Sequence, residues 1–366
     1  MIFEQLAQHG HEQVLYCHDA HSGLRAIIAI HNTVLGPALG GARMREYQSD
    51  EDALTDALRL SRGMTYKSAV AGLNLGGGKA VILGDPKQHK TEPLLRAFGR
   101  FVQSLAGRYI TAEDVGTTVR DMEIVRMETD CVTGISRSLG GSGDPSPVTA
   151  LGLFEGIKAC ARQRWGRDSL EELTVAVQGV GHVGFHLCQH LYREGAKIKV
   201  SDVDPDNLRR AADSFAVTVV APDEIYGTEC EIFSPCALGG VLDDNTIPRL
   251  RCEIVAGAAN NQLADEQRHA SLLAEHDILY APDYVINAGG LINVANELEG
   301  YDRERAVQQA AGIFNIVTEI LANAVRDGTT TVQAANALAE RRITAMRDVT
   351  RTYLGVPRLK RGRGLG

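Results

Sequence analysis

Residues 173–184 read LTVAVQGVGHVG, and this stretch decides the fold class. Its apolar residues predict a buried strand, and Gly179, Gly181 and Gly184 then have the spacing of a turn that opens a helix. Gly179 permits a tight turn, Gly181 lets a pyrophosphate approach the main chain, and Gly184 lets the helix pack closely on the strand. The segment therefore predicts a strand–turn–helix unit that binds a dinucleotide at the helix N-terminus.

Asp202 is the second signal of a dinucleotide site, because it ends the next predicted strand, about 20 residues beyond the glycines. A carboxylate there accepts hydrogen bonds from ribose hydroxyls and repels a 2′-phosphate, which favours NAD over NADP. The nearby Asp204 leaves open which carboxylate contacts the ribose, although Asp202 has the better position. A glycine-rich turn without a ligand is the alternative, and the complete strand–helix–strand context disfavours it.

The remaining pattern of the second half predicts an α/β fold with a doubly wound parallel sheet, because strands and helices alternate. Further strands are expected at 230–235, 253–259 and 278–287, and helices at 146–165, at 302–326 and from about 332 to 353.

The first half predicts a separate α/β domain. It contains a hairpin at 12–31, a helix that opens at Ser49 and Asp50, a loop and strand at 76–84, a helix at 91–106 and a strand at 108–112. The segment 134–147, GISRSLGGSGDPSP, is the clearest boundary signal, because glycine, serine and proline dominate it.

Composition limits the class of protein. A chain of 366 residues predicts two domains, and a net charge of −8 argues against a nucleic-acid partner. The seven cysteines are odd in number and form no CxxC pair, and the N-terminus has no signal-type apolar stretch, which together favour the cytoplasm. No apolar run approaches the ~20 residues of a membrane span.

Three histidines in the glycine segment raise the question of a metal. His182, His186 and His190 are spaced i, i+4, i+8, which would align them on a helix. His182 however belongs to the glycine turn, and no HExxH motif is present. We predict surface or packing histidines and no metal.

Two lysines and one carboxylate are the candidates for chemistry: Lys67, Lys79 and Asp114. A lone lysine is ordinarily a solvated surface charge. Lys79 however follows three glycines that could let a ligand approach the main chain, and it precedes an apolar strand that would desolvate its amine and lower its pKa. A chain that binds a hydride-accepting cofactor also needs an acid or base on the substrate side.

At these residues the chain resembles the amino-acid dehydrogenase superfamily, from the N-terminus to about residue 345. The resemblance is closest to the leucine/valine dehydrogenase branch, with phenylalanine and tryptophan dehydrogenases nearby. It is carried by LGPALGGARM (35–44), GMTYKSAVAGLNLGGGKAVI (63–82), YITAEDVGTT (109–118), GDPSPVTALG (143–152), VAVQGVGHVG (175–184), PCALGG (235–240), AGAANNQL (256–263) and APDYVINAGGLINVANE (281–297).

The resemblance implies reversible oxidative deamination of an L-amino acid to a 2-oxo acid and ammonia. Lys67 matches the lysine that holds the substrate carboxylate, and Lys79 matches the lysine that takes a proton from the attacking water. Asp114 matches the carboxylate that exchanges protons with the amino nitrogen. The charge on Lys67 should disfavour protonation of Lys79.

The resemblance also implies an apolar substrate pocket, in which a charged tail would be buried without a partner. Leu39 stands where glutamate dehydrogenases carry a lysine, and Ala112 leaves room for a branched aliphatic chain. Leu291, where many relatives have valine, leaves the ranking of leucine and valine open. The expected substrate-binding residues are Lys67, Leu39, Gly40, Gly41, Met64, Ala112, Asn261, Leu291 and Val294.

Two alternatives remain from the sequence. The second half also resembles tryptophan dehydrogenases, so an aromatic amino-acid dehydrogenase is one. A non-catalytic NAD-binding sensor is the other, and the joint presence of the two lysines and Asp114 speaks against it.

The implied architecture has two domains and a homo-oligomer, a dimer or an octamer. Residues 1–137 would form the substrate-binding and oligomerisation domain, joined by C-terminal helices within 329–366, and 138–328 the NAD-binding domain, with the active site in the cleft. The expected cofactor residues are Thr149, Gly179, Val180, Gly181, His182, Val183, Gly184, Asp202, Val203, Cys236, Ala237 and Asn260.

Overall fold

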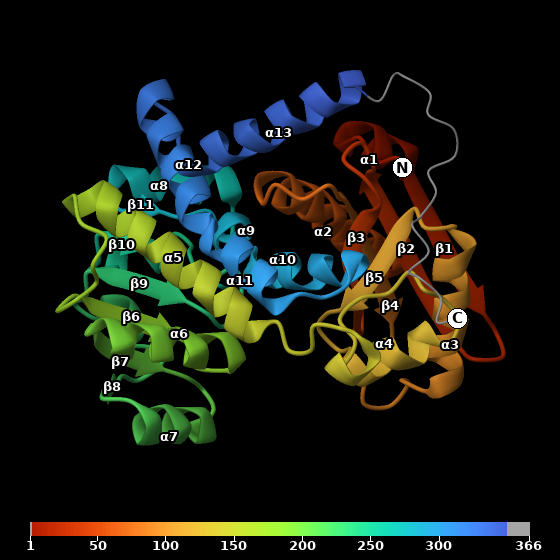
Figure 1. The fold of residues 1–366 in the computed structure, drawn as a ribbon, viewed down its shortest axis with the longest axis horizontal. Coiled ribbons are helices and arrows are strands. Elements are labelled where there is room, and N and C mark those ends of the chain that lie inside the picture. The colour runs from red at the N-terminus through yellow and green to blue at the C-terminus, as the bar shows by residue number, and fades with distance from the viewer. Residues whose placement is uncertain (1, 350–366) are drawn as a thin grey trace. The chain divides into compact units, whose positions relative to one another are not determined.

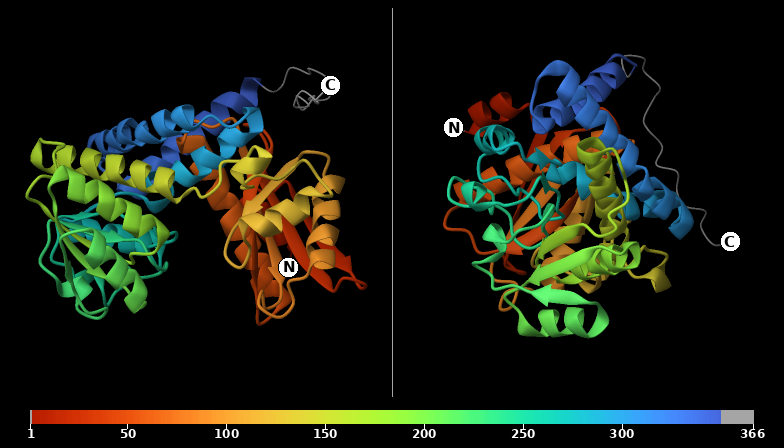
Figure 2. Two further views of the ribbon diagram at one scale, coloured as in Figure 1. Left: turned by 60° about the horizontal axis from the view of Figure 1, so that its bottom comes forward. Right: turned by 90° about the vertical axis from the view of Figure 1, so that its left-hand side faces the viewer.

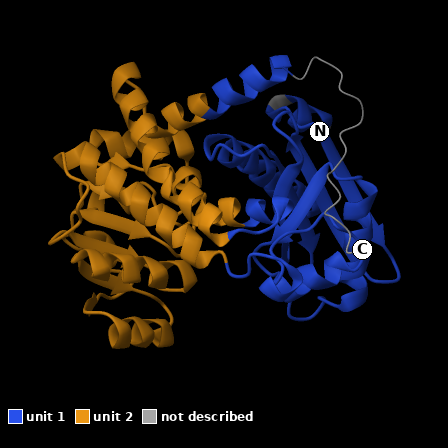
Figure 3. Ribbon diagram, viewed as in Figure 1, with its two compact units in different colours: residues 1–144, 294–302, 339–366 blue, residues 145–293, 303–338 orange. Residues whose placement is uncertain are grey.

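The structure is a computed structural model that describes residues 2–349. It contains two compact units, coloured separately in Figure 3. Unit 1 comprises Met1–Asp144, Val294–Asp302 and the chain from Ala339, and unit 2 comprises Pro145–Asn293 and Arg303–Leu338. The first exchange between units falls inside the segment rich in glycine, serine and proline.

Unit 1 is built on a mixed sheet of five strands in the order β1-β2-β4-β3-β5 (Figure 1). The hairpin expected at 12–31 is confirmed as β1–β2, which pair antiparallel. β2 and β4 are also antiparallel, whereas β3 runs parallel to both β4 and β5. The strands are β1 Gln13–Asp19, β2 Leu24–Asn32, β3 Ala38–Arg45, β4 Gly76–Leu83 and β5 Tyr109–Glu113.

Helices cover both faces of this sheet. Successive strand residues point to opposite sides, and on β2 both sets of side chains are apolar and pack against helices. Ile27 and Ala29 of β2 pack with the α2 residues Ala53, Leu54, Ala57 and Leu58. Ile28 and Ile30 belong instead to the core that contains Phe98 of α3 and Met122 of α4. The helices of this half are α1 Ile2–His9, α2 Asp50–Val70, α3 Glu92–Ser104 and α4 Val119–Arg126.

The glycines of β4 correct one expectation. Residues 76–78 were expected to form a loop with room for a ligand, but the strand already begins at Gly76. A Cβ atom would lie 1.9 Å from the Asn32 carbonyl at Gly76, 2.1 Å from the Thr65 amide at Gly77 and 2.6 Å from the Tyr109 ring at Gly78. Protein atoms fill this space, so these glycines serve close packing of β4.

Unit 2 is built on a parallel sheet of six strands in the order β11-β10-β9-β6-β7-β8. With β6 as its first strand, this is the 3-2-1-4-5-6 order of dinucleotide-binding folds, so the predicted fold class is confirmed. The strands are β6 Thr174–Gln178, β7 Lys197–Ser201, β8 Val217–Val219, β9 Ile232–Pro235, β10 Ile254–Val255 and β11 Leu279–Tyr280.

The helices of the second half pack around this sheet, and Figure 2 shows α5 and α6 side by side within unit 2. The helices are α5 Ser146–Trp165, α6 His182–Glu194, α7 Pro205–Ser214, α8 Glu266–Glu275, α9 Asp283–Ile286, α10 Gly289–Ala295, α11 Arg303–Ala311, α12 Ile313–Asp327 and α13 Thr331–Val349. Short 3-10 helices occur at Arg137–Leu139, Ile225–Gly227, Ile247–Arg249 and Asn296–Glu299.

Several expected elements differ from those observed. The helix expected at 302–326 is divided at Gly312 into α11 and α12. The strand expected at 278–287 is confined to β11, and α9 follows it. The expected end of the last helix at 353 and the basic tail lie outside the described residues. Within residues 2–349, no helix combines the length and apolar character needed to cross a membrane.

Candidate active site

Lys79 and Asp114 are in direct contact in unit 1, through Nζ and Oδ2. Lys79 lies in the middle of β4, and only 7% of its side chain is exposed. Asp114 directly follows β5, and 17% of its side chain is exposed. The structure thus brings together the two side chains that were predicted to be catalytic.

The position of Asp114 is fixed by the turn that follows it. The Asp114 amide donates to Thr117 Oγ1 at 2.9 Å, and Thr117 Oγ1 donates to the Ala42 carbonyl of β3 at 2.8 Å. The Met44 amide of β3 donates to the Val115 carbonyl at 2.9 Å. The turn is therefore tied to the neighbouring strand, which holds the carboxylate beside Lys79.

The environment of Lys79 favours its neutral amine. Burial lowers the pKa of Lys79 to about 7, and the positive charges of Arg43 and Lys67 act in the same direction, whereas Asp56 raises it. The prediction of a lowered pKa, with a contribution from Lys67, is confirmed. An amine with this pKa can accept and release a proton near neutral pH.

Sequence reasoning missed three linked side chains, of which Arg43 reaches this pair. Arg43 Nη2 lies 3.7 Å from Asp114 Oδ1, and Arg43 Nη1 lies 3.1 Å from Asp56 Oδ2. The Tyr47 hydroxyl donates to the same Asp56 oxygen at 2.8 Å. Arg43 stands inside LGPALGGARM, but nothing local to that segment indicates that Asp56, on α2, would meet it.

The sheet register places other predicted substrate residues next to Lys79. Gly41 of β3 pairs with Ala112 of β5, and the register of β3 with β4 sets Gly41 opposite Lys79. Leu39, two residues earlier on the same face of β3, is completely buried. A Cβ atom at Gly40, on the other face of β3, would lie 1.7 Å from the Gly78 carbonyl oxygen.

Met64 and Lys67 lie on α2 and are half-buried. The C-terminal end of α2 is held by Arg342 of α13, whose guanidinium donates to the Ala69, Gly72 and Leu73 carbonyls at 2.9, 3.0 and 2.8 Å. A cation at the last carbonyls of a helix complements its dipole. Sequence reasoning did not identify Arg342, which lies more than 260 residues away along the chain.

Val294, near the end of α10, is buried and begins the segment that returns to unit 1. Glu297, three residues later, accepts hydrogen bonds from the Gly134 amide at 3.0 Å, the Ser142 amide at 2.8 Å and the Ser142 hydroxyl. This carboxylate fixes the returning segment on the loop that follows β5 and α4.

In unit 2, the glycine turn has the form that a dinucleotide site requires. Gly179 has a φ of +91°, which side-chain-bearing residues rarely adopt, and a Cβ atom at Gly184 would lie 2.0 Å from the Gly179 carbonyl. At Gly181, by contrast, a Cβ atom would meet nothing within 4 Å. The turn is therefore closed toward the protein and open at Gly181, so these residues fit a pyrophosphate group.

The two carboxylates that follow β7 have different partners. Asp202 Oδ2 accepts from the Val180 amide at 2.8 Å, which ties the end of β7 to the glycine turn. Asp204 caps α7, because its Oδ1 accepts from the Asp206 amide at 2.9 Å. Val203 between them is 90% exposed. His182 and Val183 form the first residues of α6.

The other predicted cofactor residues lie at the carboxyl ends of neighbouring strands or on α5. Cys236 follows β9, and its amide donates to the Gln178 carbonyl at 2.7 Å. A Cβ atom at Gly179 would lie 2.7 Å from Ala237 Cβ. Thr149 on α5 donates its hydroxyl to the Pro145 carbonyl at 3.0 Å.

The loop after β10 holds Asn260 and Asn261. Asn287 donates to Asn260 Oδ1 at 2.8 Å, and buried Gln262 donates to the Gly257 carbonyl at 2.7 Å. Asn261 has a φ of +52°, an uncommon conformation for a residue other than glycine, and such residues cluster at functional sites. Leu291, on α10, is buried. Asn287 and Gln262 were not identified from the sequence.

Among residues 2–349, no group of three or more histidine, cysteine, aspartate or glutamate side chains is placed to hold a metal ion. His190 stacks on Phe154 with ring centroids 5.2 Å apart, and His186 packs edge-on against Phe185.

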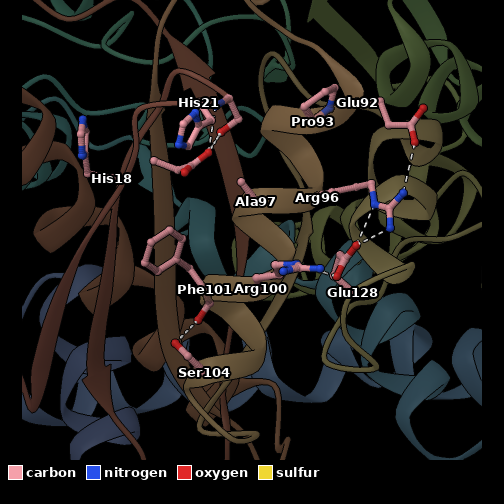
Figure 4. A pocket seen from close by; sticks show the side chains of 12 residues that line it. His18, His21, Glu92, Pro93, Arg96, Ala97, Arg100, Phe101, Ser104 and Glu128 are labelled. Carbon is pink, nitrogen blue, oxygen red and sulfur yellow. Dashed lines mark hydrogen bonds and ion pairs between the residues drawn. The ribbon is translucent and has the colours of Figure 1, made fainter.

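A pocket of about 700 Å³ lies elsewhere in unit 1, between the β1–β2 hairpin and α3 (Figure 4). Its arginines, Arg96 and Arg100, bind Glu128 at 2.7 and 2.9 Å. None of the predicted site residues lines it, so its size does not mark the active site.

Comparison with known proteins agrees with this geometry. Residues 11–131 match the family model described as Glu/Leu/Phe/Val dehydrogenase, dimerisation domain, and residues 203–351 match Glutamate/Leucine/Phenylalanine/Valine dehydrogenase. The leucine dehydrogenases of Geobacillus stearothermophilus and Bacillus cereus are 57% and 56% identical over 353 residues, 96% of each chain. The crystal structure of L-tryptophan dehydrogenase from Nostoc punctiforme superposes with a TM-score of 0.84 at 50% identity, covering 94% of this chain and 99% of that one.

A buried lysine against a carboxylate in one unit and a dinucleotide-type glycine turn in the other are the two parts that an amino-acid dehydrogenase needs. Both lie on segments that align with these relatives along almost the whole chain. This chain therefore belongs to the Glu/Leu/Phe/Val family of amino-acid dehydrogenases.

Proposed function

We propose that this enzyme catalyses the reversible, NAD-dependent oxidative deamination of branched-chain aliphatic L-amino acids, namely leucine, valine and isoleucine. The observation that carries the proposal is the contact of Lys79 with Asp114, since burial gives that lysine a pKa of about 7. The likeness to leucine dehydrogenases over almost the whole chain supports the substrate class.

In this proposal the two lysines have different tasks. Lys67 remains charged and binds the substrate carboxylate as a fixed cation. Lys79, when neutral, takes a proton from the water that attacks the imine carbon, and Asp114 exchanges protons with the substrate nitrogen. The bound nicotinamide ring supplies the chemistry of hydride acceptance.

The substrate class follows from the apolar character of Leu39, Ala112, Leu291 and Val294. A carboxylate buried among such side chains would cost several kcal/mol, so glutamate is disfavoured. One methylene changes discrimination by only about 1–3 kcal/mol, so the three aliphatic substrates should all react. The likeness to a tryptophan dehydrogenase keeps aromatic amino acids as the second candidate class.

NAD rather than NADP is the proposed cofactor, because a carboxylate at Asp202 would repel a 2′-phosphate. Asp202→Ala should lower the ratio of kcat/KM for NAD+ to that for NADP+ by about tenfold, measured with leucine as the substrate. Asp204→Ala is the matched control, since Asp204 caps α7. It should destabilise the protein by about 1 kcal/mol and leave the ratio unchanged. An unchanged ratio in Asp202→Ala would remove this carboxylate from cofactor selection.

We further propose that residues 1–137 and 329–366 form the substrate-binding and oligomerisation domain, and that 138–328 bind NAD. The description of the family model that matches residues 11–131 as a dimerisation domain supports a homo-oligomer, a dimer or an octamer. A cytoplasmic location fits the free cysteines found among the described residues.

The decisive experiment is NAD+ reduction across a panel of L-amino acids at alkaline pH, with wild type, Lys79→Ala and Lys87→Ala. Lys87 is exposed in the turn after β4 and serves as the control. We expect leucine, valine and isoleucine to react and Lys79→Ala to lose at least about 100-fold in kcat while it still binds NAD. Wild-type NAD binding without turnover of any amino acid would favour a sensor, and preference for phenylalanine or tryptophan would favour the aromatic class.

A further inference from the structure

Arg43 and Asp56 form a largely buried ion pair next to the Lys79–Asp114 contact. Their side chains are 15% and 12% exposed, and Nη1 lies 3.1 Å from Oδ2. The second nitrogen of the same guanidinium, Nη2, lies 3.7 Å from Asp114 Oδ1. One arginine therefore touches a structural carboxylate on α2 and a carboxylate of the proposed reaction.

Stability alone does not account for this arrangement. Taking most of the water away from two opposite charges costs free energy that offsets their attraction, so an ion pair with this little exposure is weak evidence for a stabilising role. Arg43 Nε is moreover buried without a hydrogen-bond partner among the described residues. An unsatisfied buried donor is a further cost to folding, which indicates that this arginine serves another purpose.

We propose that Arg43 is a positioning residue of the reaction: anchored by Asp56, it holds the Asp114 carboxylate against Lys79 and keeps a fixed positive charge beside that amine. The inference rests on the proposed function, in which Lys79 acts as the base in its neutral form. Tyr47, which donates to Asp56 Oδ2 at 2.8 Å, holds the anchor in place.

The charges around Lys79 come from β3, from α2 and from the turn after β5. Arg43 comes from β3, Asp56 and Lys67 from α2, and Asp114 from the turn after β5. The register partner on β2 is Ala29, which carries no charge. Arg43 and Lys67 lower the pKa of Lys79, whereas Asp56 raises it. The two members of one ion pair thus act on Lys79 with opposite signs.

This opposition gives a test that general damage to the fold cannot imitate. Arg43→Gln should raise the pH at which kcat/KM for leucine deamination reaches half its maximum, by about one unit from the wild-type value near 7. Asp56→Asn should move the same midpoint downward. Arg43→Lys keeps the charge and should retain the wild-type midpoint. A lysine cannot reach Asp56 and Asp114 with two separate nitrogens as the guanidinium does, so kcat should fall.

Arg59→Gln is the control, because Arg59 Nη2 lies 4.0 Å from Asp56 Oδ1 on the exposed side and 64% of its side chain is exposed. Its pH profile should match that of wild type. Equal midpoints in Arg43→Gln, Asp56→Asn and wild type, or shifts of both variants in one direction, would overturn the inference.

A second measurement follows the protonation of Lys79 without requiring catalytic turnover. Trace labelling with acetic anhydride at a series of pH values, followed by peptide mass spectrometry, reports the neutral fraction of each lysine. The Lys79 titration should move upward in Arg43→Gln and downward in Asp56→Asn. An inactive wild type with these shifts would contradict the proposed function alone, whereas an active wild type without them would contradict the role of Arg43 alone.

Discussion

Ala112 is the residue at which substrate size is most directly testable. It stands beside Gly41 in the sheet register, on the face that carries Lys79, and is 7% exposed. Ala112→Gly removes one methyl group and should raise the ratio of kcat/KM for phenylalanine to that for leucine by about tenfold. Relative rates over a panel of L-amino acids provide the measurement.

Ala42→Gly is the matched control for this change. Ala42 follows Gly41 on β3 and is completely buried, but it belongs to the core on the opposite face of the sheet from Ala112. The two variants should lose similar stability, and only Ala112→Gly should alter substrate preference. A similar shift in both, or none in either, would remove Ala112 from the substrate pocket.

Strand β4 depends on its glycines for close packing against α2, which carries Asp56, Met64 and Lys67. A Cβ atom at Gly77 would lie 2.1 Å from the Thr65 amide of α2 and 2.5 Å from the Ser61 carbonyl. Gly77→Ala should therefore force the helix and strand apart and destabilise the protein by about 3 kcal/mol, seen as a lower denaturant midpoint.

Gly63→Ala, in α2, should change the stability of the protein in the opposite direction from Gly77→Ala. Gly63 lies in α2, is exposed, and a Cβ atom there would meet nothing within 4 Å. Alanine in a helix interior is more favourable than glycine by roughly 0.5–1 kcal/mol, so this variant should be more stable than wild type. If Gly77→Ala were as stable as Gly63→Ala, close packing would not explain the glycine run.

These elements also show which parts of the site were predictable from sequence. The glycine turn and Asp202 follow one another within a single strand–helix–strand unit, so local spacing was sufficient to find them. The contact of Arg43 with Asp56 arises because α2 lies over β3, and no local pattern reports that packing. The glycines of β4 were misinterpreted for the same reason: three glycines resemble a loop locally, but tertiary packing makes them a strand.

His31 couples the stability of the protein to pH. It lies on β2 with its Nδ1 2.8 Å from Thr65 Oγ1 of α2 and its Nε2 3.0 Å from the His9 carbonyl of α1. A carbonyl only accepts, so Nε2 carries the proton and Nδ1 accepts from Thr65. Burial lowers the pKa of His31 to about 4, and the charges on His11, Arg62 and His9 act in the same direction.

Acid should therefore destabilise the protein through this residue. Above pH 6.5 the ring is neutral in both the folded and the unfolded chain, but between pH 6.5 and about 4 mainly the unfolded chain binds the proton. Stability should fall across that window by about 3 kcal/mol and level off below it. His31→Gln should flatten this dependence of the denaturant midpoint on pH, whereas His18→Gln, at an exposed position on β1, should keep it. Equal slopes in wild type and His31→Gln would show that other groups govern the acid sensitivity.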